Sequence, residues 1–300
     1  KYTKDVKGAD AVVWGIPFDA AVTNRPGARF GPQAIRRASA ILDNDPQYPF
    51  SRDLFEHLAV VDYGDCLLDS GNHQKTPGTI EREAAKILKS GAFLLTLGGD
   101  HFVTWPLLKA HAAIHGPLAL VQFDAHQDTW PDDGKRIDHG SFVGRAVNEG
   151  IIDPDRSIQI GIRTHAPDTF GIKILYGHAI EEMRASDIAY AIVDRTGGRK
   201  TYLTFDIDCL DPAFAPGTGT PVAGGPSSAK ILSTLRQLGQ IDIVGADVVE
   251  VAPAYDHADI TAIAGSMVAM QYLGLLAERK ARAEELNNGN HGATNHGQGI

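Results

Sequence analysis

Aspartate and histidine residues occur together in three short segments of the chain, and each segment directly follows an apolar run. The segments cover residues 98–101, 124–128 and 206–208. In an open α/β sheet, ligands bind just beyond the carboxyl ends of the parallel strands, so three such ends can bring these side chains to one place. Carboxylates that converge repel one another unless a cation lies between them. The pattern therefore predicts a metal site.

The types of donor atom in these segments restrict which metal ion could bind. Residues two apart in an extended segment face the same side, so Asp124, His126 and Asp128 project together, as do Asp206 and Asp208. A single aspartate at a strand end is commonly a turn former or helix cap, but the combined set favours a site. The candidate ligands are His101, Asp124, His126, Asp128, Asp206 and Asp208. These oxygen and imidazole donors, without cysteine, fit Mn²⁺ better than structural zinc. Shared between two ions, which stand roughly 3.5–4 Å apart in such sites, they would leave room for an activated water molecule, as in two-metal hydrolases.

The composition is typical of an α/β protein of the cytoplasm. The 300 residues are 43% hydrophobic, which is enough for a sizeable core, and the net charge of −9 argues against nucleic acid or an acidic membrane as a partner. It suits a cationic substrate. The two cysteines, Cys66 and Cys209, form no CxxC pair, so we expect a reducing compartment. We find no signal peptide and no apolar run that approaches the length of a membrane span, and expect no membrane association.

Apolar, β-forming runs alternate with amphipathic stretches along the chain. This alternation predicts βαβ units and a parallel sheet covered by helices on both faces. The expected strands cover residues 11–15, 58–62, 93–97, 118–123, 157–161, 172–175, 201–206 and 243–249. Helices are expected at 81–90, 188–195 and 229–238, where each ends near a glycine. We expect a single catalytic domain over residues 1–286 and a disordered, low-complexity tail over 287–300.

Four segments resemble the ureohydrolase family, which includes arginases and agmatinases. They are GGDH at 98–101, FDAHQD at 123–128, FDIDCLDPAFAPGTGTPV at 205–222 and GADVVEVAPAYD at 245–256. The similarity is greatest to bacterial agmatinases, which hydrolyse agmatine to putrescine and urea, and it runs from residue 15 to about residue 278. The resemblance implies a three-layer α/β/α fold with a central, mainly parallel eight-stranded sheet. It also implies a homo-oligomer, either a trimer or a hexamer.

The resemblance further implies two Mn²⁺ ions per subunit and gives roles to individual residues. One ion would lie on His101, Asp124, Asp128 and Asp206, and the other on Asp124, His126, Asp206 and Asp208, so that Asp124 and Asp206 bridge them. Asp128 would also pass a proton, His139 would be a proton shuttle, and Glu250 would pair with the substrate guanidinium. Taken alone, His139 could be an ordinary loop histidine and Glu250 a structural salt-bridge partner.

The implied substrate is a small cationic guanidino compound, with agmatine ranked first. The loop 129–138 lacks the Asn and Ser pattern with which arginases hold the α-amino and α-carboxylate groups. Asp132 or Asp133 could instead receive an amine. Lys135 and Arg136 could hold the carboxylate of 4-guanidinobutyrate, so a guanidinobutyrase is the alternative, and another guanidino-acid ureohydrolase is a weaker one.

Two further classes fit the residues less well. Zinc-dependent deacetylases share a related fold, but they typically need a histidine pair and a tyrosine, which the DAHxD and DID segments do not provide. Regulatory homologues with a silent site usually lose ligands, whereas all six ligand positions are intact in this chain. An active hydrolase is therefore the preferred interpretation.

Overall fold

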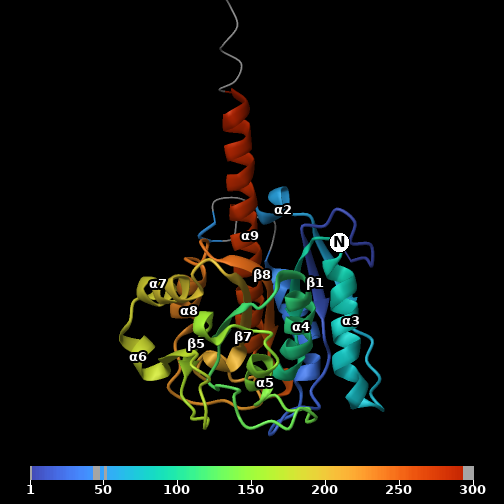
Figure 1. The fold of residues 1–300 in the computed structure, drawn as a ribbon, viewed down its shortest axis with the longest axis vertical. Coiled ribbons are helices and arrows are strands. Elements are labelled where there is room, and N and C mark those ends of the chain that lie inside the picture. Colours follow the sequence, from blue (N-terminus) through green and yellow to red (C-terminus); the bar gives the residue numbers. More distant parts are fainter. Residues whose placement is uncertain (1, 43–47, 51–52, 293–300) are drawn as a thin grey trace, which may run out of the picture.

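Eight parallel strands form one sheet in the computed structural model, which describes residues 2–42, 48–50 and 53–292 (Figure 1). The strand order is β2-β1-β3-β8-β7-β4-β5-β6, and each pairing between neighbours is parallel. The strands are β1 (Ala11–Gly15), β2 (Val60–Asp65), β3 (Phe93–Leu97), β4 (Ala119–Phe123), β5 (Ile158–Ile162), β6 (Lys173–Tyr176), β7 (Lys200–Asp206) and β8 (Asp242–Val249). The predicted fold class is thus confirmed. The strand expected at 58–62 begins later, at Val60, because the Leu58 backbone N–H still donates to Leu54 and closes a short helix.

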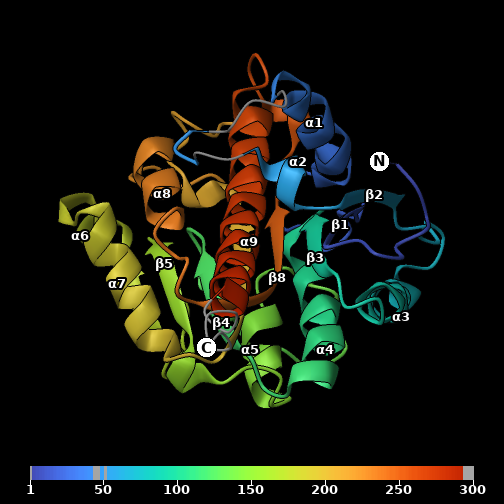
Figure 2. The ribbon, with the colours of Figure 1, turned by 90° about the horizontal axis from the view of Figure 1, so that it is seen from above.

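Helices cover both faces of the sheet and make the three layers. The helices are α1 (Gly31–Ala38), α2 (Leu54–His57), α3 (Thr76–Leu88), α4 (Thr104–His115), α5 (Phe142–Asn148), α6 (Gly177–Glu182), α7 (Ala185–Thr196), α8 (Ser228–Leu235) and α9 (Ile260–Gly292). Helix α8 packs against both α7 and α9 on one side, and α4 packs against both α3 and α5 on the other (Figure 2). Strand β3 is buried throughout and alternates between the two cores, with Leu95 and Leu97 in one apolar cluster and Leu94 in the other. Its continuous apolar run reflects burial on both faces.

One predicted helix cap is confirmed, and two helices begin earlier than the sequence predicts. Ser227 caps α8 as expected, because its hydroxyl accepts from the Lys230 backbone N–H at 3.2 Å. Helix α7 instead begins at Ala185, one residue before the serine expected to cap it, and Asp187 binds back to the backbone N–H of Arg184. Helix α3 begins at Thr76 rather than near residue 81, with a proline in its first turn, where the missing N–H costs no helical hydrogen bond.

Helix α9 corrects the expectation that no apolar run approaches the length of a membrane span. Its segment Ile260–Leu286 has a mean hydropathy of 1.6 and is long and apolar enough to cross a membrane by these two measures alone. Yet 72% of its most apolar window is buried inside the protein, where α9 packs against α1, α2 and α8. The apolar composition is that of a core helix. The helix continues past residue 286, where we expected the folded domain to end, and residues 293–300 lie outside the described residues.

His111 is a buried titratable side chain on α4, away from the candidate site. Its Nδ1 lies 2.8 Å from the Leu107 carbonyl oxygen, and its ring meets the ring of Tyr202 edge-on at 5.0 Å. A Cβ at position 245 would lie 2.2 Å from its Nε2, so the glycine there makes room for the imidazole. Burial lowers the pKa of His111 to about 4.

The free energy of unfolding is therefore expected to depend on pH through His111. The unfolded chain binds this proton below the ordinary histidine pKa of about 6.5, whereas the folded chain binds it only near pH 4. Stability is fully present above pH 6.5 and falls as the pH drops towards 4, by about 3 kcal/mol from this group. His111→Leu should remove this part of the slope in urea titrations between pH 7 and 4.5. The exposed His257→Leu should keep the slope, and an equal slope in wild type and His111→Leu would refute the assignment.

Candidate metal centre and active site

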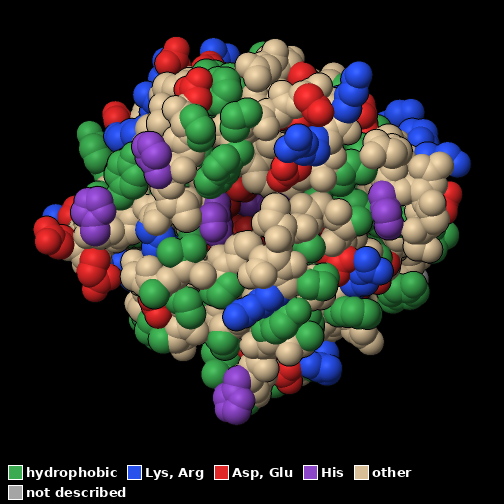
Figure 3. Space-filling view, turned by 90° about the horizontal axis from the view of Figure 1, so that it is seen from below, with side chains coloured by type: hydrophobic (Ala, Val, Ile, Leu, Met, Phe, Trp, Pro, Cys, Tyr) green, Lys and Arg blue, Asp and Glu red, His purple; other side chains and the backbone are tan. Residues whose placement is uncertain are grey.

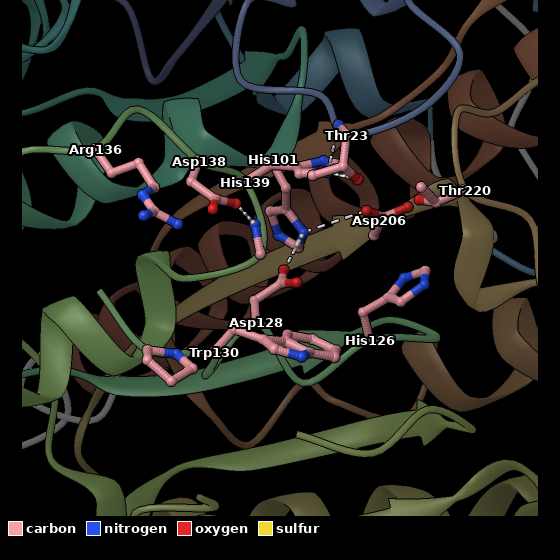
Figure 4. A pocket seen from close by; sticks show the side chains of 12 residues that line it. Thr23, His101, His126, Asp128, Trp130, Arg136, Asp138, His139, Asp206 and Thr220 are labelled. Carbon is pink, nitrogen blue, oxygen red and sulfur yellow. Dashed lines mark hydrogen bonds and ion pairs between the residues drawn. The ribbon is translucent and has the colours of Figure 1, made fainter. Parts of the chain in front are cut away.

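Four adjacent strands end at one edge of the sheet and carry the candidate residues there. They are β3, β8, β7 and β4, in this order. Leu97 and Phe205 both pair with Val248, and Phe123 pairs with Phe205, so the four strands end at nearly the same level. The segments at these strand ends are GGDH, Glu250, DID and DAHQD, of which DID begins with the last residue of β7. This topology explains why residues far apart in the sequence meet in one pocket (Figure 4).

The first cluster surrounds Nδ1 of His101. This nitrogen lies 3.0 Å from Oδ2 of Asp124, 3.1 Å from Oδ2 of Asp128 and 3.2 Å from Oδ2 of Asp206. All four residues are buried. No described residue forms a hydrogen bond of acceptable geometry with this nitrogen. An unsatisfied buried nitrogen surrounded by three carboxylate oxygens is the arrangement that a metal ion would complete.

A hydrogen-bond chain behind His101 fixes which ring nitrogen carries the proton. Nε2 of His101 lies 2.8 Å from the Thr204 hydroxyl, and that hydroxyl donates to Asp247 at 2.6 Å. Because the single hydroxyl proton goes to Asp247, Nε2 of His101 donates to Thr204, and in the neutral ring Nδ1 carries the lone pair that a metal ion could accept. Metal-binding histidines are commonly oriented in this way. Sequence reasoning missed Thr204 and Asp247; the signal was a polar residue at a buried position in the middle of each of two strands.

The second cluster surrounds His126. Its Nδ1 lies 3.1 Å from Oδ2 of Asp208 and 3.5 Å from Oδ1 of Asp124. Asp124 thus turns one oxygen to each histidine. Potential ligand atoms lie within 4.8 Å of one another in two groups that share Asp124: His101, Asp124 and Asp206, and Asp124, His126 and Asp208. The structure brings all six predicted ligands together, and Asp124 belongs to both groups. Bridging of two ions by Asp124 and Asp206 remains a prediction.

The cluster holds more negative charge than its histidines can offset. Burial and neighbouring carboxylates raise the pKa of Asp206 well above its usual range, and burial together with Asp124 raises the pKa of Asp128 to about 7. Burial lowers the pKa of His101, but the carboxylates around it more than reverse this effect and raise it well above 6.5. The site would therefore hold protons in place of metal. Divalent cations would neutralise the same carboxylates, and the nitrogen and oxygen donors fit such ions.

Two of the candidate residues have left-handed backbone conformations. Asp128 has φ of 52° and Glu250 has φ of 62°. Non-glycine residues in this region are uncommon and are held there by their surroundings. The Asp128 carbonyl accepts from the N–H groups of Val143 and Gly144, and the Glu250 N–H donates to Gly99 at 2.8 Å. The tertiary structure thus fixes both turns and aims both side chains.

His139 has both ring nitrogens occupied. Its Nδ1 lies 2.8 Å from Oε1 of Glu250, and its Nε2 accepts from the Thr23 backbone N–H at 3.2 Å, with the Thr23 hydroxyl at 3.0 Å. In the neutral form, Nδ1 therefore carries the proton. Burial lowers the pKa of His139, but the Glu250 carboxylate outweighs burial and the pKa rises to about 9. The Thr23 hydroxyl can donate to Nε2 or accept from it, so it suits either protonation state. Sequence reasoning did not find Thr23.

Glu250 lies behind His139 in the structure. Only 1% of Glu250 is exposed, and Oε1 also accepts from the His101 backbone N–H at 2.8 Å. Oε2 has no hydrogen-bond partner among the described residues. Glu250 thereby joins His139 to the segment that carries His101. Pairing with a substrate guanidinium, which the sequence predicts for Glu250, remains a prediction.

A pocket of about 570 Å³ opens over the cluster. Histidine and acidic side chains are visible at the bottom of a hollow at the centre of this face of the molecule (Figure 3). His101, His126, Asp128, His139 and Asp206 are among the lining residues, together with residues of the loop that follows DAHQD. The pocket therefore has room for a small substrate above the predicted ligands.

The loop after DAHQD differs from the sequence expectation. Asp132, predicted as a partner for a substrate amine, instead receives two hydrogen bonds from Arg145, at 2.5 and 2.7 Å, and both side chains are buried. Asp133 is exposed and accepts from the backbone N–H groups of residues 135 and 136. Neither aspartate lines the pocket, whereas Arg136 and Asp138 do (Figure 4). Sequence reasoning missed Asp138.

Comparison with known proteins defines the class. The sequence model of the Arginase family matches residues 9–274, and the chain belongs to this family. It is therefore a ureohydrolase enzyme, which confirms the resemblance seen in the sequence. It is 51% identical to an agmatinase of Chromobacterium violaceum, over 93% of this chain and 87% of that protein. It is 49% identical to an agmatinase of Neisseria meningitidis serogroup C, over 91% and 89%.

Solved structures agree with the fold. A hypothetical agmatinase from Burkholderia thailandensis is 52% identical and superposes with a TM-score of 0.92, over 93% of this chain and 90% of that one. The proclavaminate amidino hydrolase from Streptomyces clavuligerus is 38% identical, with a TM-score of 0.88, over 93% and 95%. The arginase-like three-layer architecture is thus common to this chain and to both of these structures.

Proposed function

We propose that this protein is an agmatinase, which hydrolyses agmatine to putrescine and urea and so contributes to putrescine biosynthesis. The observation that supports this most is the convergence of four carboxylates and two histidines beneath a pocket of about 570 Å³. The relatives named agmatinase, at about half of all positions identical, support the choice of substrate. We further propose a single catalytic domain over residues 1–286, a cytoplasmic location and a homo-oligomer that is a trimer or hexamer.

We propose that the residues of the cluster hold two Mn²⁺ ions. The first group is His101, Asp124, Asp128 and Asp206, and the second is Asp124, His126, Asp206 and Asp208. The unsatisfied Nδ1 of His101 and the oxygen-rich donor set support this assignment. Water at neutral pH is a weak nucleophile for the guanidinium carbon, whose positive charge is delocalised. When bound, such a pair of ions would lower the pKa of a water molecule and so supply a stronger nucleophile.

Side chains of the protein then accept and donate the protons of the reaction. Hydrolysis adds a water oxygen to the guanidinium carbon and breaks that carbon's bond to the alkyl nitrogen, which must gain a proton to leave as an amine. Asp128 lines the pocket beside His101 and is placed to accept the proton of the attacking water. His139 lines the same pocket and can carry a proton to the leaving nitrogen, while Glu250 holds its Nδ1–H. The Thr23 hydroxyl can donate to Nε2 of His139 when that nitrogen is unprotonated and accept from it when it is protonated.

Steady-state urea release after Mn²⁺ loading tests the proposal. We expect agmatine to give the highest kcat/KM among agmatine, 4-guanidinobutyrate, arginine and 3-guanidinopropionate, and a chelator to remove the activity. Arg136, which lines the pocket, favours 4-guanidinobutyrate as the second candidate. A higher kcat/KM on that acid would replace the first candidate by the second. No urea from any of the four compounds would contradict the proposed function.

A further inference from the structure

Besides His139, two charged side chains line the pocket outside the predicted metal cluster. They are Asp138 and Arg136, and both belong to the loop after DAHQD. Asp138 is partly buried, and its Oδ1 accepts from the Gly140 backbone N–H at 2.8 Å, which fixes the carboxylate in place. Arg136 is exposed at the rim. A partly buried charge is less screened by solvent than an exposed one, so Asp138 is the stronger electrostatic feature of this wall.

The indole ring of Trp130 lies on the same pocket wall, next to the glycine that holds the Asp138 carboxylate. A Cβ at Gly140 would lie 3.4 Å from Oδ1 of Asp138 and 3.7 Å from the Cε3 atom of Trp130, so both side chains border one residue. The Trp130 backbone N–H also donates to the Gly140 carbonyl at 3.1 Å, which joins the two ends of this part of the loop. Trp130 lines the pocket as well (Figure 4). An ammonium group in this part of the pocket could pair with the carboxylate and also contact the aromatic ring.

The neighbouring carboxylates of the loop are engaged elsewhere. Asp132 is held by Arg145, and the Arg145 Nη2 also donates to the Arg136 carbonyl at 2.5 Å. Asp133 caps the loop tip and does not line the pocket. These contacts hold the loop so that Asp138 is its one carboxylate on the pocket wall.

We propose that Asp138, assisted by Trp130, binds the distal ammonium group of the substrate and makes the pocket selective for guanidino-amines over guanidino-acids. The inference rests on the proposed ureohydrolase function and adds a specificity determinant to it. Asp138 is not needed to activate water or to move protons, so its contribution should fall on substrate binding. Arg136 is the residue placed to meet a carboxylate if one were bound.

The test compares Asp138→Asn with wild type on agmatine and on butylguanidine, which has the same chain without the amine. Asparagine keeps the acceptor for the Gly140 N–H and removes only the charge. We expect KM for agmatine to rise by about 10- to 100-fold, the usual effect of losing a hydrogen bond to a charged group, with kcat changed by less than about 3-fold. KM for butylguanidine should not change. Asp133→Asn, the matched control on the same loop, should behave as wild type on both compounds.

Three outcomes would overturn the proposal. The first is an unchanged KM for agmatine in Asp138→Asn, and the second is an equal rise for butylguanidine, which would indicate a structural role. The third is a wild-type preference for 4-guanidinobutyrate that Arg136→Gln removes. Calorimetric binding of putrescine and butylamine to the Mn²⁺-loaded protein separates this proposal from the proposed function. A loss of putrescine affinity in Asp138→Asn, with butylamine unaffected, would support the ammonium site even if no guanidino compound released urea.

Discussion

Asp206→Asn is expected to lose urea release by about three orders of magnitude or more, because the site would lose a carboxylate that contributes to the activation of water. Oδ2 of Asp206 lies 3.2 Å from Nδ1 of His101 within the first cluster. Oδ1 accepts from the Asp208 backbone N–H at 2.8 Å, a bond that the asparagine carbonyl can also accept, so the fold should persist. The measurement is kcat under saturating agmatine and Mn²⁺, with thermal unfolding recorded in parallel.

The same loss is expected for Asp128→Asn, because this variant also removes a carboxylate from the first cluster. Its fold should persist, since asparagine tolerates the left-handed backbone at this position. The control is Asp242→Asn, at the opposite end of β8, where the carboxylate is paired with Lys200 and Arg279. This variant should keep wild-type kcat. If Asp206→Asn or Asp128→Asn retained most of the wild-type turnover, that residue would have no essential part in the site.

His139→Asn is expected to lower kcat by roughly 10²- to 10⁴-fold, the range of general acid–base catalysis, while leaving the bound metal unchanged. The reason is its position: His139 lines the pocket, and among the described residues its side chain hydrogen-bonds to Glu250 and Thr23 and not to a predicted metal ligand. Metal content per chain, measured by elemental analysis after gel filtration, should equal that of wild type.

The exposed His165 offers a matched control, because His165→Asn changes a histidine near the same edge of the sheet without touching the predicted proton path. A fall in metal content that parallels the fall in rate would show that His139 supports metal binding. It would then have no separate role as a proton shuttle.

The sheet and the cluster could be predicted because their signals are local. Apolar runs such as Phe93–Leu97 are buried on both faces, and the acidic segments directly follow them, so strand ends and ligands were found together. Parallel pairing then brings β3, β7 and β4 to one edge without further information. The prediction of six converging ligands therefore depended on chain order and not on precise element boundaries.

The pocket wall could not be predicted because its charges depend on pairings that the local sequence does not record. Asp132, Asp133 and Asp138 look alike in the sequence, and only the contact with Arg145 on α5 removes Asp132 from the pocket. Likewise, the length and hydropathy of α9 suit a membrane span as well as a core helix. Only its packing inside the protein identifies it as a core helix. Loop aspartates gain their roles from tertiary contacts.

A crystal structure of the Mn²⁺-soaked protein, with anomalous diffraction data collected at the manganese absorption edge, tests the central claim most directly. The account predicts two anomalous peaks in each chain, one among His101, Asp124, Asp128 and Asp206 and the other among Asp124, His126, Asp206 and Asp208. The absence of any peak at this edge of the sheet, or the six side chains turned away from a common centre, would contradict it.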